Sequence, residues 1–293
     1  MAVNLTTIPK LKTFIGLDLT QSESDDLLRL IINSVSEQIA RHTDRTFERT
    51  TYKRWYDGSG TQILRLPNYP ITRVYGVATN TESVGSIQYS GSGDLASVDL
   101  NSSGLTLVNI NDAGTDTTTR ITLSGKSVTE LSTSINAQSG WSFSVDSGQG
   151  GRAATQLRPF SGGDAKDASD LDFYHPEEYR TVRVLSQVSD SIELIDDVFP
   201  CGYSNIFVWY VAGYELPGIE EQDLTVQGTL PQGLELICNQ ACADIYAIQA
   251  SDTDRSMDSE RLGDYQYKLG AGVVTAAVKR YGNELQPFMK KHL

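Results

Sequence analysis

The sequence contains few of the residues that carry catalysis at neutral pH. Its 293 residues include three histidines, His42, His175 and His292, which are scattered along the chain. No G-x-S-x-G elbow places a nucleophilic serine on a strand-to-helix turn, and none of the histidines lies in a recognisable catalytic motif. We therefore expect no enzyme, although a triad assembled from distant residues stays open.

Cysteine is also scarce, which argues against two further classes of site. Cys201, Cys238 and Cys242 include no C-x-x-C pair, so the sequence supports neither a disulfide framework nor a zinc knuckle. Cys238 and Cys242 are four residues apart in a helical pattern, and we expect both to be small core residues on one helix face. The acidic cluster at 252–260 lacks the central glycine of a calcium loop, so we expect no bound metal.

Two glycine-containing segments resemble phosphate-binding loops but lack the required context. SGQGGRA at 147–153 fits G-x-G-x-x-A, yet Pro159 and a following Gly-Gly pair prevent the long helix that must receive a pyrophosphate. SGKS at 124–127 ends like a P-loop, but Arg120 stands where the first glycine is required. We expect no nucleotide or other cofactor.

Long apolar runs are missing as well. The longest, IFVWYVAGY at 206–214, is too short to span a bilayer, and the first 16 residues lack the apolar segment of a signal peptide. We expect a soluble protein made in the cytoplasm, with no membrane partner.

The net charge of −13 is concentrated in the middle of the chain. Residues 1–80 carry ten Lys/Arg and eight Asp/Glu, residues 81–230 carry seven and 21, and residues 231–293 carry seven and eight. Because such a middle segment repels phosphates, we expect no nucleic-acid-binding domain there. DNA could still pass nearby without being bound.

The two ends of the chain show the helical period. Six apolar residues recur at three- and four-residue steps within 22–43, where Ser22 or Ser24 could cap a helix. A second amphipathic helix is predicted after Pro231, and a shorter one near 8–17. The segment 273–293 is weakly helical.

The period changes to two after Phe47, which is typical of strands. TYKRWY and TQILRL are separated by Asp57-Gly58-Ser59-Gly60, and this pattern predicts a hairpin followed by a stiff corner at Pro67 and Pro70. Between 81 and 200, short alternating runs and polar turns predict an all-β sandwich or barrel. One helix interrupts it after Ser127, where Glu130 completes a capping box.

These patterns together predict an α+β fold. We expect a small helical bundle formed by the N- and C-terminal segments, 1–80 and 205–293, with its hairpin, and a large inserted acidic all-β domain at 81–204. Aromatic residues in the strand patterns are expected in the core, with sugar stacking as the alternative: Trp141, Phe143, Phe207, Trp209 and Tyr214.

The C-terminal segment combines apolar and basic residues at a chain end. We interpret it as a partner-docking tail, with a solvated, frayed terminus as the alternative. The candidate docking residues are Lys279, Arg280, Phe288, Met289, Lys290 and Lys291.

Several motifs, taken in order, carry a resemblance to a known family. They are LKTFIGLD, SDDLLRLIINSVSEQIARHTDRTF, YDGSGTQILRLPNYPITRVYGV, LPQGLELICNQACADIYAIQAS and LGDYQYKLG. This order resembles the head-tail connector (adaptor, or head-completion) proteins of tailed bacteriophages. In that family a short opening helix and a long helix that ends in a T-x-R-x-F-like corner precede a hairpin with a D-G-S-G turn, an L-x-L-P-x-x-P-I corner and a strand. The chain departs from compact members by about 120 extra residues between the two matching halves.

The resemblance implies a structural virion protein at the head-tail interface. Such proteins form a ring, commonly twelvefold, beneath the portal protein, extend the DNA channel without binding the genomic DNA specifically, and offer a platform to neck, tail or tail-terminator proteins. One alternative is a β-sandwich glycan- or receptor-binding module of a phage tail or fibre. A hydrolase, with Asp167, Asp170 and Asp172 facing aromatic residues, is the third.

Overall fold

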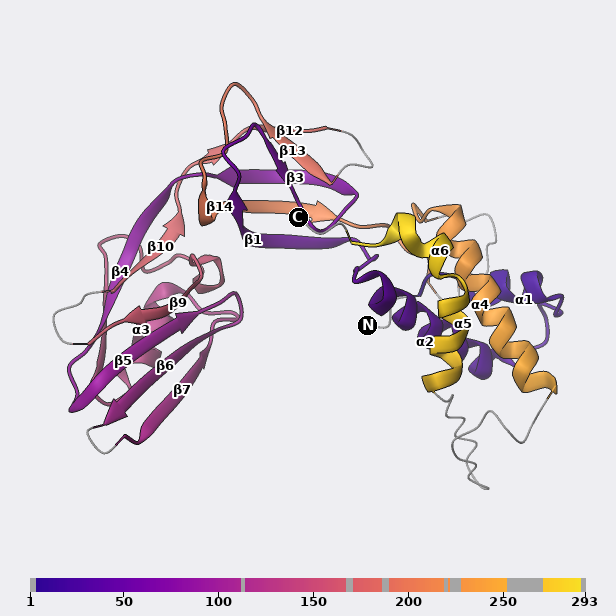
Figure 1. Cartoon of the computed structure of the whole chain (residues 1–293), viewed down its shortest axis with the longest axis horizontal. Coiled ribbons are helices and arrows are strands. Elements are labelled where there is room, and N and C mark those ends of the chain that lie inside the picture. The colour runs from indigo at the N-terminus through magenta and orange to yellow at the C-terminus, as the bar shows by residue number, and fades with distance from the viewer. Residues whose placement is uncertain are drawn as a thin grey trace. The chain divides into compact units, whose positions relative to one another are not determined.

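A computed structural model describes residues 4–111, 114–166, 171–185, 190–218, 221, 228–251 and 271–290. Within these ranges the chain has six α-helices and four antiparallel sheets, which confirms the predicted α+β class (Figure 1). It divides into two compact units. The helical unit comprises Met1–Thr50, Pro67–Pro70 and Ala212–Leu293, and the β unit comprises Thr51–Leu66 and Ile71–Val211.

The helical unit is built from both ends of the chain around one apolar core. Its helices are α1 (Ile8–Ile15), α2 (Asp25–Thr43), α4 (Gln232–Ser251), α5 (Ala271–Arg280) and α6 (Gly282–Leu285), followed by a 3-10 turn, η2 (Gln286–Phe288). The predicted long helix and the helix after Pro231 are both confirmed, and α2 packs against α4 and α5. Ser24 is the N-cap residue of α2, but its side chain makes no capping hydrogen bond.

Most of the predicted core positions of the long helices are buried, whereas Leu27 and Ile248, expected on the same faces, are half-buried. The buried positions are Leu28, Ile31, Ile32, Val35 and Ile39 on α2, and Leu234, Ile237, Cys238, Ala241, Cys242 and Ile245 on α4. Cys238 and Cys242 are free thiols, as expected of core residues. Burial, followed by the neighbouring Cys238, raises the pKa of Cys242 well above its usual value, so this thiol stays protonated.

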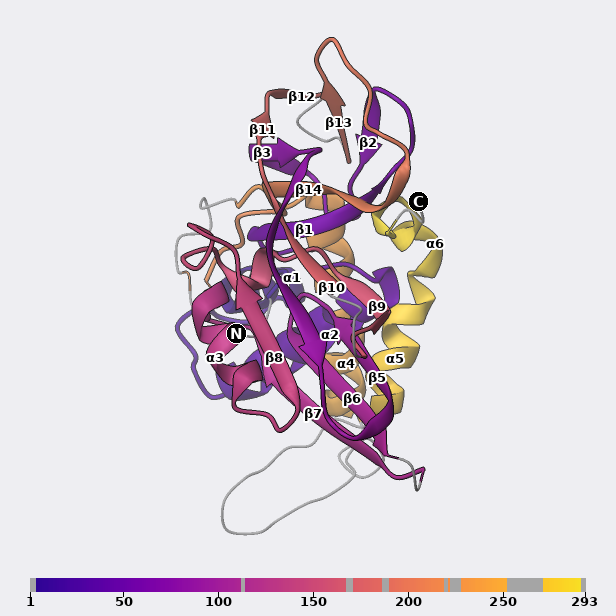
Figure 2. The same cartoon turned by 90° about the vertical axis from the view of Figure 1, so that its left-hand side faces the viewer.

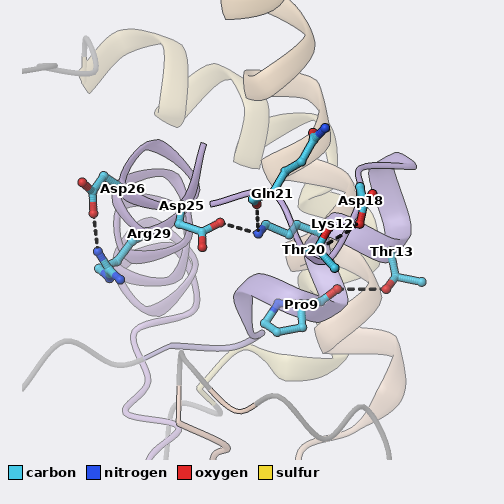
Figure 3. A network of polar contacts seen from close by, with 9 residues as sticks. All are labelled: Pro9, Lys12, Thr13, Asp18, Thr20, Gln21, Asp25, Asp26 and Arg29. Carbon is cyan, nitrogen blue, oxygen red and sulfur yellow. Dashed lines mark hydrogen bonds and ion pairs between the residues drawn. The ribbon is translucent and has the colours of Figure 1, made fainter. Parts of the chain in front are cut away.

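A buried lysine ties α1 to the start of α2 (Figure 3). Lys12 is 3% exposed, and its Nζ donates to the carbonyl oxygen of Gln21 at 2.5 Å and forms an ion pair with Asp25 at 2.5 Å. Gly16, with φ 76°, ends α1 in the left-handed conformation that favours glycine. The buried ammonium of Lys12 therefore joins the two helices, and its burial requires that it stay paired with Asp25.

The first part of the β unit consists of two small sheets. One has the order β1-β14-β3-β11, formed by Thr50–Gly58, Gly202–Ala212, Ile71–Ala78 and Tyr179–Arg180. The other has the order β12-β13-β2, formed by Val182–Val184, Ser191–Leu194 and Ile63–Arg65. Tyr52 stacks on Tyr210 at 5.2 Å between ring centroids, and the Tyr56 and Tyr210 hydroxyls lie 2.8 Å apart.

The predicted hairpin across Asp57–Gly60 is wrong. β1 pairs with β14 and β2 pairs with β13, so the two strands belong to different sheets. Gly58 is required by a close approach instead of a tight turn, because a Cβ there would lie 1.8 Å from the carbonyl oxygen of Pro200. The end of β1 anchors the start of β14: Ser204 N donates to Asp57 Oδ1 at 2.7 Å, and Gly58 N donates to Asn205 Oδ1 at 2.9 Å.

The second part of the β unit, which we call the β4–β10 segment (residues 81–176), has a core of its own. One sheet has the order β10-β4-β8 (Figure 2), formed by Leu171–Pro176, Thr81–Tyr89 and Trp141–Val145. The other has the order β7-β6-β5-β9, formed by Asp116–Thr122, Gly104–Asn111, Gly93–Leu100 and Phe160–Asp164. The helix α3 (Val128–Asn136) packs on β8, and a 3-10 turn, η1 (Ala154–Gln156), follows β8.

The capping box predicted for α3 is confirmed. Glu130 N donates to the Ser127 hydroxyl at 3.3 Å, and Ser127 N donates to the Glu130 carboxylate at 2.7 Å. The hydrogen bonds that the Glu130 carboxylate accepts from Ser127 N and from the Ser127 hydroxyl lower the pKa of Glu130. The two ends of the β4–β10 segment lie side by side, because Glu177 N donates to the Asn80 carbonyl oxygen at 3.1 Å. Its core residues all lie between Val84 and Phe173.

The aromatic residues predicted for the core are placed largely as expected. Trp141, Phe143, Phe207 and Tyr214 are buried, while Trp209 is half-buried beneath the Lys53 ammonium, 4.2 Å from its ring centroid. None of the four buried rings is open to stack on a sugar.

Candidate partner-docking site

The structure places five of the six candidate docking residues. Lys279 and Arg280 are exposed in the last turn of α5, and Phe288 and Met289 are half-buried after α6. Lys290 follows them, and Lys291 lies outside the described residues. The candidate site is therefore split between an exposed basic helix end and a segment that packs on the helical core.

The second part is tied to the end of α2. Asp44 has φ 51° and reverses the chain, and Arg45 N donates to the Ala40 carbonyl oxygen at 3.1 Å. Lys290 N donates to the Thr43 carbonyl oxygen at 2.8 Å, and its ammonium pairs with Asp44 at 2.8 Å. An orphan carbonyl at the helix end is thus satisfied by the C-terminal segment.

Arg45 is the centre of this arrangement. Its side chain is buried, and its guanidinium lies 3.6 Å from the Tyr69 ring centroid and 5.1 Å from that of Phe47. Nη1 donates to the Phe288 carbonyl oxygen at 3.1 Å, and Nη2 donates to the Tyr69 carbonyl oxygen. A planar, permanently charged fork with flat stacking faces suits two carbonyls and two rings, and lysine could not replace it.

Two further contacts close the arrangement. The Tyr69 hydroxyl donates to the Met289 carbonyl oxygen at 2.8 Å, and Gly213 N donates to the Pro70 carbonyl oxygen at 3.0 Å. We call the residues Thr43–Phe47, Pro67–Pro70 and Phe288–Lys290 the Arg45 clasp. Burial raises the pKa of the adjacent Tyr214, and the Arg45 charge acts against that rise.

The exposed part of the site is partly paired. Arg280 forms an ion pair with Asp244 at 3.3 Å, and the Tyr281 hydroxyl donates to the same carboxylate at 3.1 Å. Burial, and then Asp244, raise the pKa of Tyr281. The Arg280 side chain keeps 64% of its surface exposed, and Lys279 is exposed beside it. The exposed Lys279 and Arg280 can offer positive charge to a partner. The buried part of the site holds the backbone of residues 288–290 against the end of α2.

The sequence analysis did not predict that Arg45 and Tyr69 hold the C-terminal segment. The signal was present in part, because an arginine two residues beyond a helix end, directly before Thr46-Phe47, is an unusual place for a solvated charge. Their partners are backbone carbonyls, which have no sequence signature.

Of the three histidines, the structure describes His42, in the last turn of α2, and His175. His175 is buried on β10, its Nδ1 lies 3.0 Å from the Pro176 carbonyl oxygen, and burial lowers its pKa. His292, Asp167 and Asp170 lie outside the described residues. Across the described chain, no group of three or more His, Cys, Asp or Glu side chains could hold a metal ion. Of the helices in these ranges, none has the length and apolar character needed to cross a membrane.

Comparisons with protein-family models, with curated proteins and with solved structures found no match to this chain. The function proposed below therefore depends on the contacts within the chain and on the order of its motifs.

Proposed function

We propose that the protein is a head-to-tail adaptor, a structural virion component that forms a ring below the portal of a tailed bacteriophage. The ring, twelvefold as is common in the family it resembles, extends the DNA channel and lets genomic DNA pass without specific binding. Its lower face is the platform for neck, tail or tail-terminator proteins. The proposal assigns it no catalytic activity, no cofactor and no membrane partner.

The observation that carries this proposal is the Arg45 clasp. The T-x-R-x-F corner, the second half of the L-x-L-P-x-x-P-I corner and the C-terminal segment meet at one side chain. The first two are motifs on which the resemblance depends. Their convergence supports the interpretation that these motifs belong to one structural core.

The proposed arrangement is a helical bundle made from both ends of the chain, carrying an inserted β domain. Contacts between distant residues support it: Lys10 pairs with Glu235 at 2.8 Å, and the Ser36 hydroxyl lies 3.9 Å from the Cys238 sulfur. We assign the inserted domain to contacts with tail or fibre proteins. Because Asn80 and Glu177 are already hydrogen-bonded, a chain could lose residues 81–176 without separating the remaining strands.

Light scattering tests the proposal, using the chain alone and mixed with the portal protein of its own virus. We expect a complex whose mass corresponds to a ring on the portal, even if the free chain is a monomer. A chain that never joins the portal would contradict the adaptor function.

Two variants refine this measurement. Lys279→Glu reverses an exposed charge in the candidate docking site and should weaken the complex, whereas Arg120→Glu, an equal change on exposed β7, should not. A chain in which Asn80 is joined to Glu177 by Asn-Gly should still assemble. Loss of assembly in that chain would show that the β4–β10 segment forms ring contacts.

A further inference from the structure

We propose that a cavity in the β unit binds a neutral saccharide. The cavity has a volume of about 660 Å³, within the range of small-molecule sites, and it is lined by residues of β5, β9, β10 and the start of β14. The inference is independent of the adaptor function, because it uses none of the residues of the Arg45 clasp.

Aromatic rings form part of the wall. Tyr203, Tyr174 and Phe160 all line the cavity, and Tyr203 is 74% exposed. Phe160 packs edge to face on buried Phe173, with 5.3 Å between ring centroids, so this part of the wall is rigid. An exposed ring beside a rigid one is suited to contact the apolar face of a sugar.

The backbone around Tyr203 is held in an uncommon conformation. Ser204 has φ 44°, which few residues other than glycine adopt, and its N–H is fixed by Asp57. The Tyr203 carbonyl oxygen accepts a hydrogen bond from Arg158 Nη2 at 2.9 Å. The exposed ring is therefore presented by an anchored backbone, which reduces the entropy lost when a ligand binds.

Polar groups lie among these rings. Arg158 N donates to the Tyr174 carbonyl oxygen at 2.8 Å, and the Tyr174 hydroxyl donates to Asp172 at 3.3 Å. The Asn101 side-chain oxygen accepts from Ser103 N at 2.9 Å and from Gly104 N at 3.0 Å, which fixes its amide and leaves the NH2 group as its donor. The lining thus offers both donors and acceptors, as a polyhydroxylated ligand requires.

The charge of the lining argues against anionic ligands and against wholly apolar ones. Arg158 is balanced by Asp172, and residues 81–230 carry 21 acidic against seven basic side chains, so a phosphate or nucleotide would be repelled. A wholly apolar ligand would desolvate Arg158 and Asp172 without replacing their hydrogen bonds with water. A neutral ligand with hydroxyl groups and an apolar face satisfies both constraints.

The test uses the full chain on an array of defined oligosaccharides, followed by titration calorimetry with the best-bound oligosaccharide and with ATP as an anionic probe. We expect saccharide binding and no ATP binding. Tyr203→Ala should raise the Kd about tenfold or more, and Tyr203→Phe should change it less than about threefold because the ring remains. Tyr75→Ala, which removes a 48% exposed tyrosine from β3, is the matched control and should have no effect.

Three results would overturn the inference: no binding on the array at millimolar concentration, ATP binding that competes with the saccharide, or equal loss in the Tyr203→Ala and Tyr75→Ala chains. Assembly of the Tyr203→Ala chain with the portal is measured in parallel and should be unchanged. A failure of saccharide binding is thereby distinguished from a failure of the adaptor function.

Discussion

The helical unit and the β4–β10 segment are each stabilised by a different kind of internal contact. The helical unit joins residues that are far apart in the sequence, such as Arg45 and Phe288 or Lys10 and Glu235, and it buries the cations Arg45 and Lys12. The β4–β10 segment pairs strands within one continuous stretch of the chain, from neighbours such as β5 with β6 to its two ends, β4 with β10, around a core of apolar and aromatic residues. The difference indicates that the helical unit needs both chain ends, whereas this segment closes on itself.

The chain provides a separate probe for each unit. Its three tryptophans, Trp55, Trp141 and Trp209, all belong to the β unit, so fluorescence reports on that unit alone. Of the α-helices in the described ranges, all except α3 belong to the helical unit, so circular dichroism at 222 nm reports mainly on that unit. Urea unfolding followed by both signals can therefore assign each loss of stability to a unit.

The largest expected effect is on the β unit. Phe173→Ala removes a fully buried ring that contacts Phe143 and Phe160 and should lower the free energy of unfolding by about 4 kcal/mol. Fluorescence should show the loss while the 222 nm transition stays in place. Phe14→Ala, at a 44% exposed phenylalanine of α1, is the control and should change little. A joint shift of both transitions would mean that the units unfold as one.

The next effect breaks the helical unit. Arg45→Met keeps much of the stacking volume but leaves the Tyr69 and Phe288 carbonyls unpaired, at a cost of about 3 kcal/mol. The 222 nm transition should move and the fluorescence transition should not. Arg49→Met removes a neighbouring arginine whose ion pair with Glu215 is solvent-exposed, and it should cost less than about 1 kcal/mol. Equal losses in the two chains would show that the clasp has no special weight.

Removing an N-cap side chain should have a smaller effect on stability, and one such cap can be tested in each unit. Ser127→Ala removes the N-cap side chain of α3. Thr7→Ala removes that of α1, where the Thr7 hydroxyl accepts a hydrogen bond from Lys10 N at 3.3 Å. Each should cost about 1 kcal/mol. The first should appear in fluorescence and the second at 222 nm. The reverse assignment would contradict the division into units.

The last expected effect is a pH dependence of the β unit. Burial lowers the pKa of His175, so below about pH 6.5 the unfolded chain binds a proton that the folded chain does not. Stability of the β unit should fall as the pH decreases from 7 to 5, by at most about 1.4 kcal/mol per pH unit. His175→Gln should flatten this fall in the fluorescence transition. An unchanged slope in that variant would assign the dependence to other groups.

Much of the local structure could be predicted because its causes are local. Buried positions of α2 and α4 follow from the spacing of apolar residues, and the capping box of α3 from Ser127 and Glu130. The prediction of a hairpin at Asp57–Gly60 was wrong because an Asp-Gly pair favours a tight turn but does not specify which strands pair with each other.

The sequence by itself determined the helices, the presence of a strand-rich middle and the residues that fill each core, since these depend on periodicity and on the hydrophobic effect. Only the tertiary structure decided that β1 pairs with β14, that Arg45 holds Tyr69 and Phe288, and that Tyr203 stands exposed beside a cavity. The physical reason is that these contacts join distant segments through backbone groups. Every residue has a carbonyl oxygen, so the path of the chain selects which one a side chain meets.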